Sequence, residues 1–227
     1  NDIFDGIAFY AGKTMSNGKE RYLAGWCPTR IGDGDPDQWG GSLVCHHMLF
    51  NADGTIDLKL PDGIDKKFTT LKKTVLIDKS GKAVKKENSY VLSDVASVSF
   101  PRLDKTCKIE ATVKATGDED VFGFAFGACD DKTEVYSIRF DLKSKKMIMS
   151  KDDLTRGTTP AQTDVTLAVP ADKQFKVKIV AEKSVCVMYV NDKIAFSNRI
   201  DKMPKNPWAI FTDKGTEVSF SDIKVYE

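Results

Sequence analysis

Three aromatic side chains near the start of the chain, Tyr10, Trp26 and Trp39, are of the kind that recognises sugars. Sugar rings have apolar faces on which such side chains stack, while polar groups hold the hydroxyls. Trp39 follows a loop rich in glycine, aspartate and proline, and loops on rigid sheets often carry binding groups. The alternative for Trp26, and for Phe9, is that the ring fills a hydrophobic core. We predict that Tyr10, Trp26 and Trp39 bind a carbohydrate.

The chain has two histidines, His46 and His47, which are adjacent. Adjacent residues of a strand point to opposite faces of the sheet, so the two cannot bind one metal ion from an unbroken strand. We expect His46 to line the sugar-binding pocket and the other histidine to lie in the core or at the surface. The spacing of cysteine and histidine is not that of a zinc site, and no metal or other cofactor is predicted.

The loop Asp33-Gly34-Asp35-Pro36-Asp37 resembles a calcium-binding loop only in part. It lacks the full alternation of acidic residues and the glutamate at the twelfth position. We interpret it as a solvated turn, and a structural calcium ion remains the alternative.

The five cysteines are Cys27, Cys45, Cys107, Cys129 and Cys186. Their number is odd and none forms a CxxC motif, so buried thiols are the favoured interpretation. Cys27 and Cys45 flank the connection 28–44 and could face each other across two strands. A disulfide between them is the alternative, and it requires Cα atoms within about 7 Å.

The composition is that of an ordinary globular domain, with 41% hydrophobic and 30% charged residues. A net charge of +1 argues against nucleic acid or an anionic membrane as the main partner. The sequence contains no run of eighteen apolar residues, so membrane insertion is not predicted. The lysine groups at 66–73, 82–86 and 143–146 are expected to be solvated faces and turns.

Hydrophobic residues alternate with polar ones along most of the chain, for example over 108–113, 136–142 and 176–181. This period of two is typical of antiparallel sheets with one face on a core. Turn-forming pairs separate these runs, at Asn17-Gly18, Asp53-Gly54, Ser80-Gly81, Asn191-Asp192 and Lys214-Gly215. The predicted fold class is therefore all-β.

We divide the chain into a four-stranded segment (1–65), a linker (66–74) and a two-sheet antiparallel sandwich (75–227) of jelly-roll or lectin-like type. Four short strands make one propeller blade, which cannot bury both of its faces alone. The first segment should therefore pack on the sandwich or on a missing partner. The predicted strands are 6–15, 20–28, 41–50, 55–60, 74–77, 89–92, 95–101, 106–115, 121–128, 133–141, 145–150, 163–168, 174–181, 184–190, 193–199, 207–212 and 216–226.

The order of three motifs, Phe9-Tyr10-Ala11, Gly25-Trp26 and Trp39-Gly40-Gly41, resembles the late propeller blades of family 32 glycoside hydrolases. This family includes invertases, levanases and inulinases, and its propeller is followed by a β-sandwich. The resemblance implies that Phe9, Tyr10, Trp26 and Trp39 help to shape a pocket for fructosides or related sugars. It also implies a missing N-terminal propeller as a partner and a secreted, periplasmic or cell-surface location.

The carboxylates that hydrolyse glycosides in this family lie in WMNDPNG-like, RDP-like and EC-like motifs, and none of these occurs here. The resemblance places them upstream of Asn1, so no catalytic residue is assigned. The sequence departs from the pattern of this family at two places. Ala8 stands before the Phe9-Tyr10-Ala11 motif where family members often have an aspartate, and Cys45-His46-His47 stands where they have a Pro-Arg-Glu run.

Two other hypotheses remain open. A lectin-like binding module predicts an exposed aromatic cleft on the sandwich, formed by Trp208 or Tyr136, although the apolar surroundings of Trp208 also fit a buried strand. A purely structural domain predicts no affinity for sugars.

Overall fold

The structure is a computed structural model that describes residues 4–29, 38–103, 105–127, 135–152, 163–200 and 206–227. Almost all regular elements in these ranges are strands, and the one helix is a single turn, α1 (Asp62–Asp65). The prediction of an all-β chain ending in a two-sheet sandwich is confirmed.

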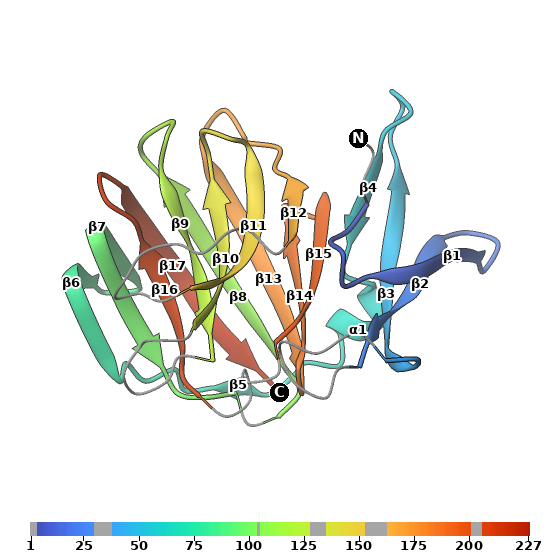
Figure 1. The fold of residues 1–227 in the computed structure, drawn as a ribbon, viewed down its shortest axis with the longest axis horizontal. Coiled ribbons are helices and arrows are strands. Elements are labelled where there is room, and N and C mark those ends of the chain that lie inside the picture. The colour runs from blue at the N-terminus through green and yellow to red at the C-terminus, as the bar shows by residue number, and fades with distance from the viewer. Residues whose placement is uncertain (1–3, 30–37, 104, 128–134, 153–162, 201–205) are drawn as a thin grey trace.

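The first part of the chain forms a four-stranded antiparallel sheet in the order β1-β2-β3-β4. Asn17-Gly18 and Asp53-Gly54 make the turns as predicted, and both glycines have positive φ angles. This sheet lies at one end of the molecule, at the right of Figure 1. Its strands are β1 (Tyr10–Ser16), β2 (Arg21–Pro28), β3 (Gly41–Phe50) and β4 (Ile56–Lys59).

The rest of the chain forms two sheets that share one long strand, β7 (Ser89–Phe100). The second half of β7 pairs with β16 and its first half with β17, so the ladder continues from one sheet into the other. One sheet has the order β12-β11-β10-β9-β16-β7 and the other β7-β17-β8-β13-β14-β15. The strands are β8 (Cys107–Ala115), β9 (Val121–Phe126), β10 (Val135–Asp141), β11 (Lys146–Asp152), β12 (Thr163–Thr166), β13 (Gln174–Glu182), β14 (Val185–Val190), β15 (Ile194–Arg199), β16 (Trp208–Thr212) and β17 (Glu217–Tyr226).

Phenylalanine rings from both sheets fill the sandwich core. Phe122 of β9 is fully buried, and its ring stacks on Phe140 of β10 at 5.1 Å. The Phe122 ring also contacts Phe175 at 5.8 Å and Phe220 at 6.2 Å, which belong to the opposite sheet. Contacts between aromatic rings of this kind stabilise beyond the apolar area that they bury.

Strand boundaries differ from the prediction mainly between residues 71 and 100. The segment 74–77, which was predicted to be a strand, has no regular secondary structure. It connects two strands that were not predicted, the short β5 (Leu71–Lys72) and the longer β6 (Asp78–Lys86). Ser80-Gly81 makes no turn: the β6–β7 register shifts there, in a bulge at Gly81, whose Cβ would lie 2.1 Å from the Val95 carbonyl oxygen. The predicted strands 89–92 and 95–101 are one strand, which continues through Asp94 although this residue has a positive φ of 55° and the β6–β7 register shifts there.

The N-terminal sheet packs against β14 and β15, at the free edge of the sandwich. Leu23, Val44 and Leu58 form an apolar cluster with sandwich residues such as Val187 and Ala195. A backbone hydrogen bond from Leu58 N to Lys193 O, 2.9 Å long, joins β4 to the β14–β15 turn. One face of the N-terminal sheet is therefore covered by the sandwich.

An ionic cluster reinforces the connection between the two parts. Asp65 of α1 forms ion pairs with Lys108 of β8 and Lys178 of β13, and Lys108 also contacts Glu110 at 2.7 Å. Burial opposes ionisation of Asp65, but the hydrogen bonds from the two lysines outweigh it and lower the pKa of this carboxyl group. The pKa values of both lysines are raised, because the ion pairs outweigh the desolvation that opposes their charge.

We expect this cluster to make stability fall in acid. Because the pKa of Asp65 is lower in the folded state, its contribution is complete above the unfolded value of about 4 and is lost as the pH falls through the folded value. Asp65→Asn should lower the free energy of unfolding by about 1–3 kcal/mol at pH 7, with a smaller difference from wild type at pH 2.5. Urea unfolding at pH values from 2.5 to 7 measures this difference in the free energy of unfolding. Asp164→Asn is the control, because Asp164 forms an ion pair with Lys146 at the surface. A constant difference between wild type and Asp65→Asn would contradict this role.

Candidate functional site

The two faces of the N-terminal sheet have different surroundings. Leu23 and Val44 point toward the sandwich, where they belong to the apolar cluster. Tyr10, Trp26 and Leu43 are consecutive cross-strand partners on β1, β2 and β3, and they lie on the opposite face. Tyr10 is 51% exposed and Leu43 is 79% exposed. The sheet thus presents an outer apolar row that no described residue covers completely.

A hollow of about 180 Å³ lies at this row, lined by Tyr10, Trp26, Pro28, Gln38 and Trp39. The rings of Tyr10 and Trp26 are nearly parallel, with centroids 6.1 Å apart. Trp39 stands at 60° to Trp26 with centroids 6.5 Å apart, and it is 88% exposed. The structure therefore brings together the three aromatic residues that the sequence singled out.

Hydrogen bonds at the base of the hollow fix the segment that carries Trp39. The Gln38 N–H donates to Thr29 O at 2.8 Å, and the Thr29 N–H donates to Gly40 O at 3.0 Å. Gly40 has a φ of +97°, which a residue with a side chain rarely adopts. This backbone geometry holds the Trp39 side chain at the edge of β3.

The indole N–H of Trp26 is buried and has no hydrogen-bond partner in the described part of the chain. A buried donor without a partner costs about 1–3 kcal/mol. The amide of Gln38 adds a further polar group to the lining. The site therefore combines stacking surfaces with polar groups, as carbohydrate recognition requires.

None of the described residues lining the hollow is a carboxylate. Hydrolysis of a glycoside needs two carboxylates placed on either side of the bond. The described lining can hold a sugar ring, but it does not supply this chemistry.

His46 is not part of the hollow, and the prediction for this residue is wrong. Its side chain is fully buried on the face toward the sandwich, where Nε2 lies 2.9 Å from Asp5 Oδ2 and Nδ1 lies 3.0 Å from Tyr189 Oη. Both ring nitrogens of His46 therefore already have hydrogen-bond partners in this chain. Asp5 in turn accepts hydrogen bonds from Ser197 N at 2.5 Å and from Ser197 Oγ at 2.6 Å. Burial, followed by the Asp5 carboxylate, raises the pKa of Tyr189 well above its usual value.

His47 points to the other face, as the alternation of a strand demands. Its ring lies 5.1 Å from that of Tyr22, and Nε2 is 4.0 Å from Glu20 Oε1. The prediction that the two histidines separate is therefore confirmed.

Phe9 lies in the core, not in the hollow, and this agrees with the core interpretation of this residue. It packs on the inner apolar cluster, and its ring lies 5.1 Å from that of His46. A Cβ at Gly25 would approach the Phe9 ring to 2.5 Å, so glycine lets this ring lie across β2.

The cysteines that the structure describes, Cys27, Cys45, Cys107 and Cys186, are free thiols. The possible bridge between Cys27 and Cys45 does not form, because Cys27 is paired with Ser42 and Cys45 with Ala24 across β2 and β3. Burial, and then the nearby Asp5, raises the pKa of the Cys27 thiol to about 12. Cys129 lies outside the described residues.

Trp208 and Tyr136, the candidates for an exposed cleft on the sandwich, are both only 2% exposed. The possible calcium loop 33–37 lies outside the described residues. Among those described, no cluster of three or more His, Cys, Asp or Glu side chains could hold a metal ion. The described part of the chain also contains no helix with the length and apolarity needed to cross a membrane.

Comparison with protein families matches residues 54–225 to the model described as "GH32, BT1760-like, C-terminal domain". No curated protein sequence matches the chain.

Solved structures match between 70% and 99% of the chain. The β-fructofuranosidase of Aspergillus kawachii shares 15% identity over 99% of this chain and 47% of its own, with a TM-score of 0.69. The exo-inulinase of Aspergillus awamori shares 16% identity over 99% of this chain and 44% of its own, with a TM-score of 0.67. The carbohydrate-binding module CBM66 of Bacillus subtilis shares 10% identity over 70% of this chain and 99% of its own, with a TM-score of 0.55. At these identities the likeness concerns the fold, and the chain spans less than half the length of the two enzymes.

Proposed function

The chain belongs to the GH32 family through its BT1760-like C-terminal domain, and we propose that it is the sugar-binding C-terminal portion of a glycoside hydrolase acting on fructosides or related sugars. The observation that carries this proposal is the hollow formed by Tyr10, Trp26 and Trp39. The catalytic carboxylates would lie in a part of the protein outside these 227 residues.

We propose further that residues 1–65 are a propeller blade, 66–74 a linker and 75–227 the sandwich domain. The exposed Leu43 on the outer face of the N-terminal sheet supports a missing propeller as its partner, because a neighbouring blade would cover this side chain, which does not line the hollow. In this arrangement the sandwich covers one face of the blade, and the propeller covers part of the other face and leaves the hollow open. A secreted, periplasmic or cell-surface location would give such an enzyme access to polysaccharides.

Trp39→Ala should weaken binding of levan-derived fructo-oligosaccharides to this chain by about three- to tenfold, because one stacking surface of the hollow is lost. Titration calorimetry measures this change. Phe50→Ala is the matched control, since Phe50 is a 61% exposed aromatic residue of the same sheet that does not line the hollow. Equal affinities of wild type and Trp39→Ala, or an equal loss in both variants, would contradict the proposed site.

A lectin-like module is the second candidate, and the likeness to the CBM66 fold favours it. In that case the sandwich would bind the sugar, and Trp39→Ala would leave the affinity unchanged. The same titration therefore separates the two candidates.

A further inference from the structure

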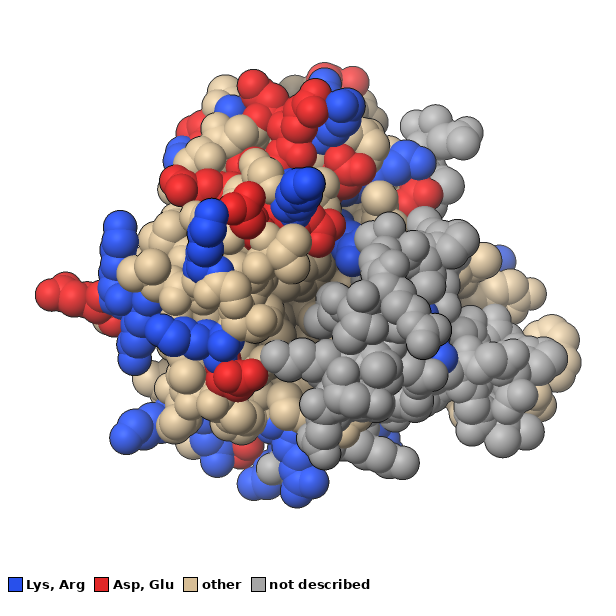
Figure 2. All heavy atoms as spheres, turned by 60° about the vertical axis from the view of Figure 1, so that its left-hand side comes forward, with Lys and Arg blue, Asp and Glu red and all other residues tan. Residues whose placement is uncertain are grey.

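The lysines of this chain are unevenly distributed. Residues 66–86 contain eight lysines and one aspartate, a local charge of +7, which leaves −6 for the rest of a chain whose total is +1. Figure 2 brings the side with β6 and β7 forward and shows basic side chains over the lower left of this face, with isolated acidic ones among them. Such a concentration of one sign attracts anions from a distance.

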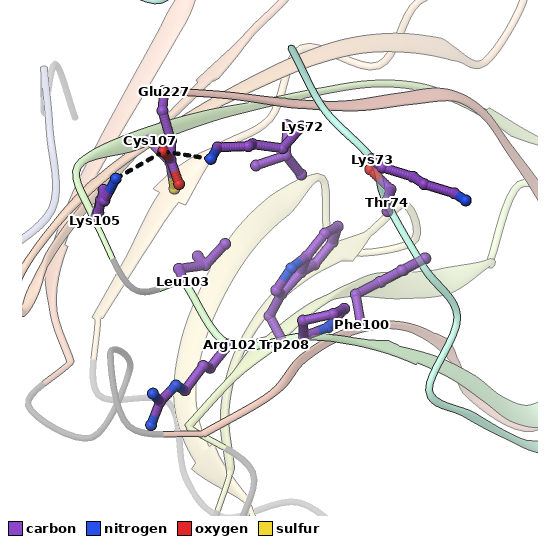
Figure 3. Close-up of a pocket in the computed structure, with 12 residues that line it drawn as sticks. Lys72, Lys73, Thr74, Phe100, Arg102, Leu103, Lys105, Cys107, Trp208 and Glu227 are labelled. Atoms are coloured by element: carbon purple, nitrogen blue, oxygen red, sulfur yellow. Dashed lines mark ion pairs between the residues drawn. The ribbon is translucent and has the colours of Figure 1, made fainter. Parts of the chain in front are cut away.

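A hollow of about 130 Å³ opens within this basic region of the sandwich (Figure 3). It lies where β5, the end of β7 and the end of β17 meet, together with residues 101–103 and 105. Its charged lining consists of Lys72, Lys73, Arg102, Lys105 and one carboxylate, Glu227, so the lining carries an excess of three positive charges. We call it the basic hollow.

The basic hollow already holds a carboxylate between two ammonium groups. Glu227 Oε2 lies 2.9 Å from Lys72 Nζ and 3.4 Å from Lys105 Nζ, and Figure 3 shows the two lysines reaching it from opposite sides. The hydrogen bond from Lys72, followed by smaller contributions that include Lys105, lowers the pKa of Glu227. The geometry is therefore suited to a carboxylate or a similar anion.

The other wall of the basic hollow is apolar. Leu103, Phe100 and Trp208 line it, and the rings of Phe100 and Trp208 stack with centroids 4.4 Å apart. The volume is below the roughly 300–1,000 Å³ of sites for drug-sized ligands. A single small ring with an apolar face and one anionic group matches this combination of walls and size.

A second hollow of about 330 Å³ adjoins the basic hollow and shares Thr74 and Phe100 with it. Its charged lining consists of Lys85, Lys224, Glu87 and Asp222, so it carries no net charge. The excess of positive charge therefore belongs to the basic hollow, and the second hollow offers only room for a neighbouring ring.

We infer that the basic hollow binds an acidic sugar residue of an anionic polysaccharide. The carboxylate or sulfate group of the sugar lies beside Lys105, the ring lies on Pro101 and Val225, and Lys73 adds positive charge on the opposite side (Figure 3). Single-stranded nucleic acid fits less well, because its bases stack on exposed aromatic rings and the rings of Phe100 and Trp208 are almost completely buried. A sugar ring does not need an aromatic platform and can lie on the accessible aliphatic residues of the lining, Pro101 and Val225. The site is separate from the aromatic hollow on the N-terminal sheet, and it does not depend on the proposed function of that hollow.

The test is the affinity of the chain for polygalacturonate and for dextran sulfate at low salt, with neutral levan as a reference. Lys73→Ala/Lys105→Ala should weaken binding of at least one of the two anionic polymers by about tenfold or more, because the contact at Lys105 and two of the four positive charges of the lining are lost. Glu227→Gln should strengthen it by about two- to fivefold, since a competing carboxylate is removed. Raising the salt concentration should weaken binding in every case. The two polymers distinguish a carboxylate from a sulfate ligand.

Lys19→Ala/Lys143→Ala is the matched control, because it removes the same charge from exposed lysines outside both hollows. Its affinity should equal that of wild type. An equal loss of affinity in the two double variants would mean that the overall charge of the chain, and not the basic hollow, determines binding, and it would overturn the site. Absence of binding to both anionic polymers would overturn it as well, as would binding only to phosphatidylglycerol vesicles or to RNA.

Discussion

Asp5→Ala is expected to lower the free energy of unfolding by about 3–5 kcal/mol, because it breaks a buried network at the junction of the N-terminal sheet and the sandwich. Asp5 is 6% exposed and accepts hydrogen bonds from Gly6 N, Ser197 N and Ser197 Oγ, while its Oδ2 lies 2.9 Å from His46 Nε2. Without the carboxylate these buried groups lose a partner and are too far from solvent to regain one. The contact between the N-terminal sheet and β15, which contains Ser197, should be weakened most.

Urea unfolding followed by circular dichroism measures this loss. Asp53→Ala is the control, because Asp53 accepts hydrogen bonds from Thr55 in an exposed turn and should contribute less than about 1 kcal/mol. His46→Ala should also destabilise, and the double variant with Asp5→Ala should lose less than the sum of the single variants, since both residues belong to one network. Additive losses would mean that the two residues act independently.

The sequence contains the information for most strands because their side chains alternate between a core and solvent. In β13, Phe175, Val177 and Ile179 are buried while the intervening lysines are less so, and the strand was predicted within one residue of its end. Turn-forming residues mark the β14–β15 hairpin, whose loop is residues 191–193. Asn191 and Asp192 both take positive φ angles, as in a type I′ turn, and the Lys193 N–H donates to Val190 O at 3.0 Å.

β6 escaped prediction because it is an edge strand with almost no apolar pattern. Only Ala83 of its nine residues is buried, and lysines occupy many of the exposed positions. Lysine on an edge strand discourages pairing with other chains, but a lysine-rich segment is also typical of a solvated loop. Gly81 favoured the loop interpretation as well, because a glycine in a bulge and a glycine in a turn cannot be distinguished without the partner strand.

The aromatic hollow was predictable because its members come from motifs close in sequence and from neighbouring strands. The direction of His46 was not, since both faces of β3 carry apolar residues: Leu43 and Cys45 on one face, Val44 and Met48 on the other. Alternation shows that two faces exist, but it does not say which one meets the sandwich. Asp5 gave no signal at all, because its partner Ser197 is 192 residues away in the chain.

Phe122→Ala is expected to destabilise the sandwich by about 3–5 kcal/mol, because a fully buried ring is lost from between the sheets and leaves a cavity. Phe122 contacts Phe140 in its own sheet and Phe175 and Phe220 across the core, so all of these rings lose a neighbour. Thermal and urea unfolding measure the loss. Val95→Ala, at a 65% exposed site, should change stability by less than about 0.5 kcal/mol.

The variant also tests whether the two apolar clusters contribute independently. Phe122 belongs to the sandwich core, whereas the Asp5 network adjoins the second cluster at the junction, and the two share no hydrogen-bond or ring partner among the described residues. Losses from Phe122→Ala and Asp5→Ala should therefore add within about 0.5 kcal/mol. A smaller combined loss would mean that the N-terminal sheet detaches before the sandwich unfolds, so that the junction contributes little to the stability of the sandwich itself.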